Sequence, residues 1–177
     1  MAEILDVAPT KSKLIDLKET LEFARVSHDL LERKREILVL ELLNRIDLLK
    51  GMIQKMEADL DEAYGQLVQA AMILGPHLLN QIAFSIPCDL HVNVQEASVM
   101  GVEIPMVELE KGEFSRRYGL MGTSSVLDEA RRKFLQALFA AAELAELETA
   151  VYRIAVEFKK NQMRVNALEN IFIPQYE

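Results

Sequence analysis

Between Thr10 and Leu74 the sequence reads TKSKLIDLKETLEFARVSHDLLERKREILVLELLNRIDLLKGMIQKMEADLDEAYGQLVQAAMIL. This stretch contains no proline, and its only glycines are Gly51 and Gly65. A second stretch, from Ser125 to Ile173, contains neither residue. Because proline and glycine are the residues that most disfavour a helix interior, each stretch is predicted to form one long helix.

Both predicted helices carry a seam of mainly apolar residues at alternating steps of three and four, which is typical of a coiled coil. The first seam runs through Leu14, Leu17, Leu21, Ala24, His28, Leu31, Arg35, Leu38, Leu42, Arg45, Leu49, Met52, Met56, Leu60, Ala63, Leu67, Ala70 and Leu74. The second runs through Leu127, Ala130, Phe134, Ala137, Ala141, Leu144, Val151, Ala155, Phe158 and Val165. A helix of about 60 residues is about 90 Å long, which exceeds the width of a compact domain of this size. The two helices are therefore predicted to lie side by side, antiparallel.

The segment between the helices has the pattern of a β-hairpin. Gly75-Pro76 ends the first helix, and apolar residues then alternate with polar ones around Val92 and Val94. Met100-Gly101 can form the turn, and alternation resumes at Val102 and Ile104. The hairpin is expected over about residues 90–110, with Pro105 confining the second strand to an edge or a bulge. Such a hairpin is marginal alone, so it is expected to rest on the helices or on a partner.

The fold class predicted from these patterns is mainly α, a long antiparallel two-helix coiled coil with a small β-hairpin insert. Residues 1–177 are expected to form a single elongated domain, with helices over 10–75 and 125–173 and a connector over 76–124. Ser125 and Asp128 have the spacing of a capping box at the start of the second helix, and Pro174 is expected to end it. If the chain folds back near Met100, Glu177 lies opposite about Phe23.

That register leaves Leu14 to Leu21 without an opposing helix. Three explanations stay open: this end projects as a single helix, a partner surrounds it, or the chain is shorter than its ancestors. Its exposed apolar seam makes self-association plausible.

Composition excludes several classes of function. The net charge is −8 with acidic and basic residues mixed, which argues against nucleic acid and gives no polybasic signal for a membrane surface. No apolar run approaches the ~20 residues of a membrane span, and the N-terminus lacks the features of a secretory signal. Cys88 is the only cysteine, which fits a reducing compartment. A cytoplasmic chain is expected.

No residue pattern points to catalysis or to a cofactor. His28, His77, His91 and Cys88 lack the spacing of zinc ligands, and the acidic run over residues 57–62 is explained by a solvated helix face. The sequence has no phosphate-binding loop and no nucleophile motif. We therefore predict no catalytic, cofactor-binding or metal-binding residue, and interpret His28 as a hydrogen-bonded core histidine.

Arg35 and Arg45 are charged residues at seam positions, and two interpretations apply. The seam frame can drift, so that both side chains extend their guanidinium groups to water. Alternatively, they fix the register of the helix pair or face an oppositely charged partner.

Segments near both ends carry a family resemblance. Pro9-Thr10-Lys11 is followed by LLERKR over residues 30–35, and residues 163–174 read MRVNALENIFIP. These segments resemble the Pro-Thr-Lys/Arg, Leu-Leu-x-x-Lys-Arg and Arg-Arg-Val-Asn-Ala-Leu-Glu motifs of the D subunit of the V-type (archaeal and bacterial A/V-type) rotary ATPases. Two departures stand out: Met163 replaces the first arginine of that last motif, and most relatives continue in further helix beyond the position of Glu177.

The resemblance implies a central-stalk rotor subunit of an ion-translocating V-type ATPase or ATP synthase, with a part in ATP synthesis and hydrogen ion transport. The paired helices would stand inside the ring of catalytic A-type and regulatory B-type subunits. A small F-type companion would bind alongside, and a membrane-sector connecting subunit would lie at the hairpin end. Such a chain transmits torque without catalysing a reaction, lies in the cytoplasm peripheral to the membrane, and neither inserts into it nor binds nucleic acid.

The partner-binding residues implied by the resemblance form two groups. Those expected to contact the ring are Lys11, Lys34, Arg35, Arg164 and Asn166. Those expected in the hairpin that supports partner coupling are Val92, Val94, Val102 and Ile104. A prefoldin-like chaperone, whose subunits also combine terminal helices with a central hairpin, and a non-catalytic coiled-coil scaffold are the alternative functions.

Overall fold

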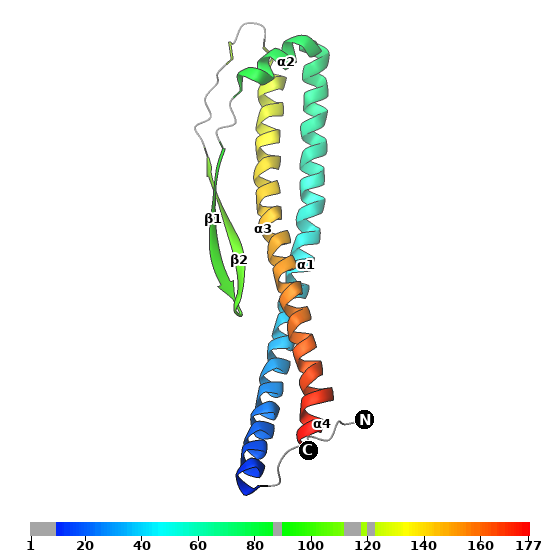
Figure 1. Ribbon diagram of the computed structural model, residues 1–177. Coiled ribbons are helices and arrows are strands. Elements are labelled where there is room, and N and C mark those ends of the chain that lie inside the picture. Colours follow the sequence, from blue (N-terminus) through cyan, green and yellow to red (C-terminus); the bar gives the residue numbers. More distant parts are fainter. Residues whose placement is uncertain (1–9, 87–89, 112–117, 120–122) are drawn as a thin grey trace. The chain divides into compact units, whose positions relative to one another are not determined.

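A computed structural model describes residues 10–86, 90–111, 118–119 and 123–177 (Figure 1). The elements are α1 (Lys11–Leu74), α2 (Pro76–Ser85), β1 (Leu90–Val99), β2 (Val102–Lys111), α3 (Ser125–Ala167), the π-helix η1 (Leu168–Phe172) and α4 (Ile173–Tyr176). The predicted class, two long helices with a hairpin between them, is confirmed. Two compact units divide the chain: Met1–Arg45 with Val99–Val102 and Val151–Glu177, and Ile46–Ser98 with Glu103–Ala150.

In the first unit, the beginning of α1 pairs with the end of α3 in antiparallel direction. The cross-helix contacts join Arg25 to Glu177, Leu31 to Asn161, and Lys34 to Glu157. Residue numbers rise along α1 as they fall along the opposing segment, which defines the direction. Glu177 meets Arg25, close to the predicted Phe23, while Leu14 is exposed as that register requires. The buried side chains here are Ala24, Leu38, Val102, Ile154, Asn161 and Val165.

In the second unit, the later part of α1 pairs with the beginning of α3. Lys133 Nζ lies 2.8 Å from Glu62 Oε2, and the rings of Tyr64 and Phe134 meet edge to face with centroids 5.2 Å apart. The helix seam is rich in alanine, with Ala63, Ala70, Ala130, Ala137 and Ala150 buried. At its α2 end, a cluster of buried side chains is formed by Ala70, Ile82 and Leu127, with Leu74, Leu79, Ile86, Tyr118 and Val126 packed against it.

The predicted seams are largely confirmed. Every α1 seam position from Leu17 to Leu74 is buried or half-buried, and so is every predicted position of α3. Two of the most buried side chains of α3, Ile154 and Asn161, were nevertheless missing from the predicted seam.

The junction between α1 and α2 depends on two residues. Gly75 has a φ of 77°, a left-handed conformation that glycine adopts without strain, and Pro76 occupies the first turn of α2. The predicted end of α1 is confirmed. The segment after it, described from sequence only as a connector, begins with the ten-residue helix α2.

The start of α1 was predicted correctly, whereas the end of the last helix was not. Thr10 caps α1 as expected, since its Oγ1 accepts a hydrogen bond from the Lys13 amide at 3.3 Å. The prediction that Pro174 ends the last helix is wrong, because helical structure continues to Tyr176. The Ile173 amide bonds to the Leu168 carbonyl five residues back, and this wider turn accommodates a proline that an α-helix interior would reject.

The hairpin has the predicted extent and a two-residue turn. Met100 and Gly101 have φ values of 53° and 77°, the combination of a type I′ turn. The hairpin rests on α3 as expected, because the Val107 amide donates to Glu146 Oε2 at 2.8 Å.

Candidate partner-binding surfaces

Lys11 lies at the start of α1, where Thr10 caps the helix, and its side chain is exposed. The first turn holds no acidic residue. A lysine at a helix N-terminus adds positive charge to the positive end of the helix dipole. This end of α1 therefore presents a positive potential to an acidic partner.

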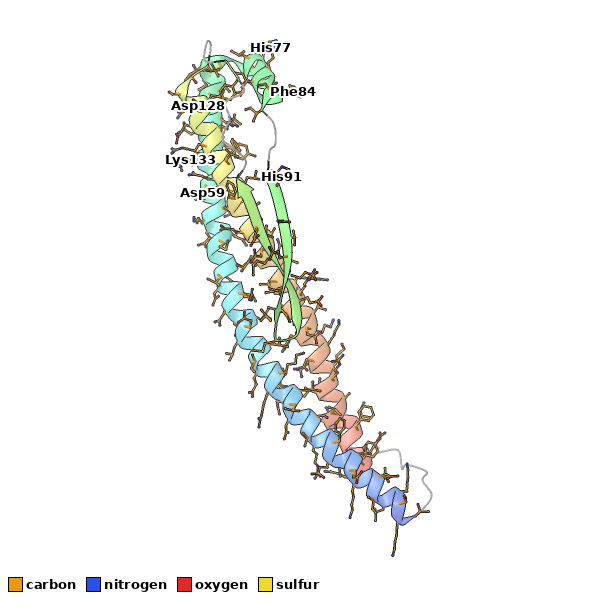
Figure 2. All side chains as sticks on the ribbon, turned by 90° about the vertical axis from the view of Figure 1, so that its left-hand side faces the viewer. Asp59, His77, Phe84, His91, Asp128 and Lys133 are labelled. Carbon is orange, nitrogen blue, oxygen red and sulfur yellow. The ribbon has the colours of Figure 1, made fainter. Side chains whose placement is uncertain are left out.

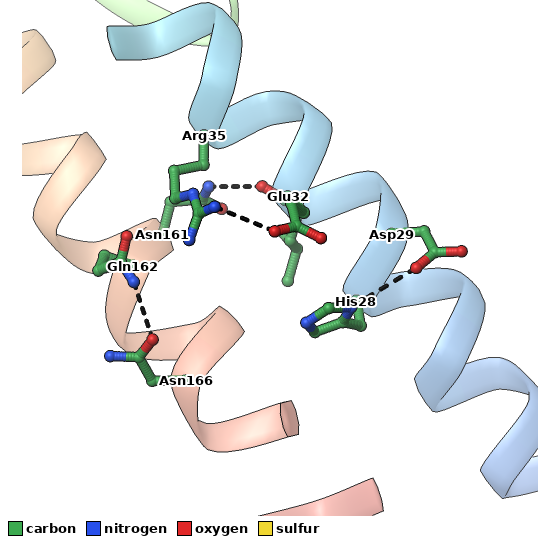
Figure 3. A network of polar contacts seen from close by, with 8 residues as sticks. His28, Asp29, Glu32, Arg35, Asn161, Gln162 and Asn166 are labelled. Carbon is green, nitrogen blue, oxygen red and sulfur yellow. Dashed lines mark hydrogen bonds and ion pairs between the residues drawn. The ribbon is translucent and has the colours of Figure 1, made fainter. Parts of the chain in front are cut away.

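Lys34 and Arg35 lie together on α1 and are already engaged within the first unit. Lys34 Nζ is 3.5 Å from Glu157 Oε1 across the helix pair. Arg35 is 3.0 Å from Glu32 one turn earlier, as Figure 3 shows. Both side chains are half-buried. Each keeps donors for a further acceptor, because an ammonium has three N–H groups and a guanidinium five.

Asn161 lies beside these residues at the centre of the helix pair. Its Nδ2 donates to the Leu31 carbonyl at 2.8 Å, whereas its buried Oδ1 has no hydrogen-bond partner among the described residues (Figure 3). A buried polar group at a seam position specifies the register of a coiled coil at a cost in stability. Asn161, rather than Arg35 or Arg45, is therefore the polar side chain that the described structure buries between the helices.

Arg35 and Arg45 themselves pair along their own helix. Arg35 bonds Glu32, and Arg45 Nε lies 2.7 Å from Glu41 Oε1 one turn earlier. Half-buried stems with locally paired guanidinium groups match the interpretation in which these side chains extend toward solvent.

Arg164 and Asn166 occupy the last turns of α3, and both are exposed. The Asn166 Oδ1 accepts from Gln162 Nε2 at 2.8 Å, and its carbonyl accepts from Asn170 Nδ2 at 3.0 Å. Met163, which replaces an arginine of the resembling motif, is also exposed. Figure 3 shows Asn166 beyond Asn161 on α3, joined to Gln162 by this hydrogen bond.

The four predicted hairpin residues divide between two environments. Val102 and Ile104 are buried, at 6% and 7% exposure, so they hold the hairpin in place by packing. Val92 and Val94 are 53% and 59% exposed and are free to meet a partner.

A further surface escaped the sequence analysis. Large apolar side chains are exposed in the first unit away from its seam: Ile15, Phe23, Val26, Leu30, Ile171 and Phe172. Exposed apolar side chains mark an interaction site where they form a continuous patch. The signal was present in the sequence, since removing seam positions from the apolar residues of each helix leaves these residues.

The second unit exposes apolar side chains near α2. Phe84 is 93% exposed and Met72 80% exposed (Figure 2 labels Phe84). Phe84 was not expected because α2 was not predicted as a helix, and Met72 lies on α1 outside the predicted seam.

The Tyr118 side chain contacts two residues in the first turns of α3. Its hydroxyl donates to Asp128 Oδ1 at 2.5 Å, and the Arg131 guanidinium lies over its ring, 5.8 Å from the centroid. Burial, and then the hydrogen bond to Asp128, raise the pKa of the Tyr118 phenol above its ordinary value. The capping box expected between Ser125 and Asp128 was wrong: α3 begins at Ser125 itself, and the Asp128 carboxylate serves Tyr118.

Comparison with known proteins shows the family of the chain. The family described as the D subunit of ATP synthase matches residues 13–177. The chain belongs to the ATP synthase D subunit family. This membership makes it a component of an A/V-type ATP synthase, as the resemblance of its terminal segments implied.

Similar proteins come from bacteria and archaea. The V-type ATP synthase D subunit of Thermotoga neapolitana is 39% identical over 170 residues, which cover 96% of this chain and 84% of the relative. The A-type ATP synthase D subunit of Methanopyrus kandleri is 36% identical over 178 residues, covering 99% and 77%. The A-type D subunit of Pyrococcus horikoshii is 32% identical over 180 residues, covering 100% and 84%.

The described residues also bear on metal binding and on the capacity to span a membrane. Within residues 10–86, 90–111, 118–119 and 123–177, no group of three or more His, Cys, Asp or Glu side chains is placed to hold a metal ion. In the same residues, no single helix has the length and hydropathy to cross a membrane. Among these helices, α1 and α2 reach the threshold only when taken together, and they are bent by 117° relative to one another.

Proposed function

We propose that the chain is the central-stalk rotor subunit of an ion-translocating A/V-type ATPase or ATP synthase. It transmits torque between the catalytic ring and the membrane sector and catalyses no reaction itself. The observation that carries the proposal is the match to the ATP synthase D subunit family over residues 13–177. That match favours the rotor over a prefoldin-like chaperone or a general scaffold.

Cross-helix polar contacts in the first unit support a torque-bearing role. Twisting one helix around the other requires their side chains to slide past one another. Asn161 holds the Leu31 carbonyl, and the Lys34–Glu157 and Arg25–Glu177 ion pairs lie on either side of it in sequence. Since each contact is directional or charged, a change of register breaks it, and the helix pair resists relative twist.

Asymmetry of this surface supplies the coupling. A ring of three catalytic interfaces around one asymmetric helix pair meets a different surface at each interface. The three sites are thereby biased toward different conformations, and rotation exchanges these biases. We infer that Lys11, Lys34, Arg35, Arg164 and Asn166 make the polar ring contacts, and that the exposed apolar side chains of the first unit add to them.

The hairpin serves coupling to other subunits. Val92 and Val94 are exposed to a partner, while Val102 and Ile104 are buried and hold the strands. We infer that the partners are the A-type and B-type ring subunits, a small F-type companion and a membrane-sector connecting subunit. In this assembly the chain lies in the cytoplasm, peripheral to the membrane.

A reversible cross-link to the ring tests rotation directly. Cys88 is the only cysteine, so the Cys88→Ser variant provides a cysteine-free background into which Met163→Cys places one exposed thiol. The ATPase carrying this variant is purified from the native host and treated with a reducible reagent that joins the thiol to a nearby lysine. Linking the chain to a ring subunit should abolish steady-state ATP hydrolysis, and reduction should restore it.

The Cys88→Ser variant without the added cysteine is the matched control and should keep full activity under the same treatment. Undiminished hydrolysis in a fully cross-linked complex would mean that the chain is a static component. Absence of the chain from the purified ATPase would reject its place in the complex.

A further inference from the structure

The type of turn in the β-hairpin determines which backbone amides point outward along each of its two edges. A two-residue turn at Met100-Gly101 places Val99 opposite Val102 in a hydrogen-bonded pair, and hydrogen-bonded pairs recur at every second residue. The amides between those pairs point away from the partner strand. On β2 they belong to residues 103, 105, 107 and 109, and on β1 to residues 92, 94, 96 and 98.

The outer edge of β2 is closed. Pro105 has no amide hydrogen, and the outward amide of Val107 donates to Glu146 Oε2 on α3 at 2.8 Å. This bond supports the register, because it requires the Val107 N–H to point away from β1. A proline and a covering helix are two of the means by which proteins protect a sheet edge from further pairing.

The outer edge of β1 has no such protection. Leu90–Val99 contains no proline, lysine or arginine, and the side chains from His91 to Glu96 are exposed. In the described part of the chain, no backbone hydrogen bond outside the hairpin ladder involves residues 91–98. In Figure 1 the two strands cross, and toward the turn β1 lies on the side of the hairpin away from α3. An unprotected ten-residue edge is a template for another strand.

Charge indicates which strand fits. Residues 90–111 carry four glutamates, at positions 96, 103, 108 and 110, against the single Lys111, a net charge of −3. A second copy of this hairpin would bring an equal negative charge against the first. A segment carrying lysine or arginine is attracted instead.

We propose that the outer edge of β1 docks an extended basic segment of another protein as a third strand. The outward amides of Val92, Val94, Glu96 and Ser98, with their neighbouring carbonyls, form the backbone ladder, as in other cases of strand addition. The valine side chains provide apolar contact, and Glu96 pairs with a basic residue of the incoming strand. This proposal rests on the proposed function in taking another component of the same complex as the partner.

The test uses the isolated full chain and a synthetic peptide, Lys-Val-Lys-Val-Thr-Val-Lys-Val, with binding followed by isothermal titration calorimetry and amide shifts. Val94→Pro removes one outward N–H and, like the native Pro105, breaks no bond to the other strand. Because a lost backbone hydrogen bond is worth about 1 kcal/mol, binding should weaken about fivefold. Val94→Thr, which keeps the N–H, is the matched control and should bind within about twofold of the unchanged chain.

A second variant keeps the test valid if circular dichroism finds Val94→Pro misfolded. Glu96→Lys keeps every backbone group and should weaken binding of the basic peptide several-fold while strengthening binding of its glutamate counterpart. Equal binding to the unchanged chain, Val94→Pro and Glu96→Lys, or no binding to any, overturns the proposal. So does a dimer formed through β1 in sedimentation velocity. These outcomes do not affect the cross-linking experiment. Failure of the proposed β1 docking site can therefore be distinguished from failure of the proposed rotor function.

Discussion

The two compact units bury different side chains along one pair of helices. The first unit buries the large residues Leu38, Ile154 and Val165 together with Asn161, whereas the second buries alanines such as Ala63 and Ala137. Large branched residues contribute more burial per position, while alanines allow the backbones to approach closely. The first unit therefore depends on a few residues, and the second distributes its packing over many small ones.

Polar contacts follow the same division. In the first unit a buried amide, Asn161, and the half-buried Lys34–Glu157 pair lie between the helices. The second unit relies on an apolar cluster at its α2 end and on the ring contact of Tyr64 with Phe134. The second unit also has a cross-helix ion pair, between Lys133 and Glu62, but among the described residues the buried polar side chain between the helices, Asn161, belongs to the first unit.

Truncating a large seam residue should have the largest effect. Leu38→Ala removes a fully buried side chain from the first unit and should lower the free energy of unfolding by about 3 kcal/mol, from lost burial and the remaining cavity. Urea unfolding followed by circular dichroism measures the loss. Leu40→Ala, at an exposed position of the same helix, should change it by less than about 0.5 kcal/mol. Equal losses for the two variants would contradict the dependence on few residues.

Replacing the buried amide should have a smaller effect of opposite sign. Asn161→Leu removes an unpaired buried oxygen and should raise the free energy of unfolding by about 1 kcal/mol. The same change should loosen the register, because an apolar seam accepts several alignments. A disulfide between Arg25→Cys and Glu177→Cys, in the Cys88→Ser background, reports the alignment and should form less completely. Lower stability with unchanged disulfide yield would show that Asn161 contributes stability and not register.

The smallest effect is expected in the second unit, at Tyr118. The folded-state pKa of the phenol is raised, so its stabilising contribution is complete below the ordinary pKa and is lost as the pH rises through the higher value. The unchanged chain should therefore lose more stability than Tyr118→Phe between neutral pH and a pH above about 10. At neutral pH, the variant should be less stable by about 0.5 kcal/mol. Parallel pH profiles in urea unfolding would contradict this assignment.

Periodicity explains what could be predicted of the fold. The first seam is regular for many turns, so even the charged Arg35 and Arg45 could be placed in it, and the hairpin follows from strict alternation and Met100-Gly101. Ile154 and Asn161 were missed because the spacing on α3 changes after Leu144, and because a polar residue does not mark a seam. The helix α2 was missed because ten residues are too few for periodicity to identify, although Pro76 marks a helix start.

The candidate site could be predicted by residue type but not by pairing. Sequence identified Lys34 and Arg35 as candidate contacts, yet the partner of Lys34 lies 123 residues away and requires the register of the helix pair. It also grouped Val92 and Val94 with Val102 and Ile104, because alternation alone does not determine which side of a two-stranded sheet is covered. The engagement of Asp128 by Tyr118 joins two elements that local motifs treat separately.

The π-helix η1 (Leu168–Phe172) changes the direction in which the side chains after it point around the helix axis. One additional residue in a turn rotates later side chains by about 100° about the helix axis, relative to an uninterrupted α-helix. After Val165 and Leu168, a regular seam would continue at Phe172, whereas the half-buried residues are Ile173, Gln175 and Tyr176. The inserted residue delays the phase of the seam by one position, so that Phe172 points outward and its neighbour Ile173 takes the inner place.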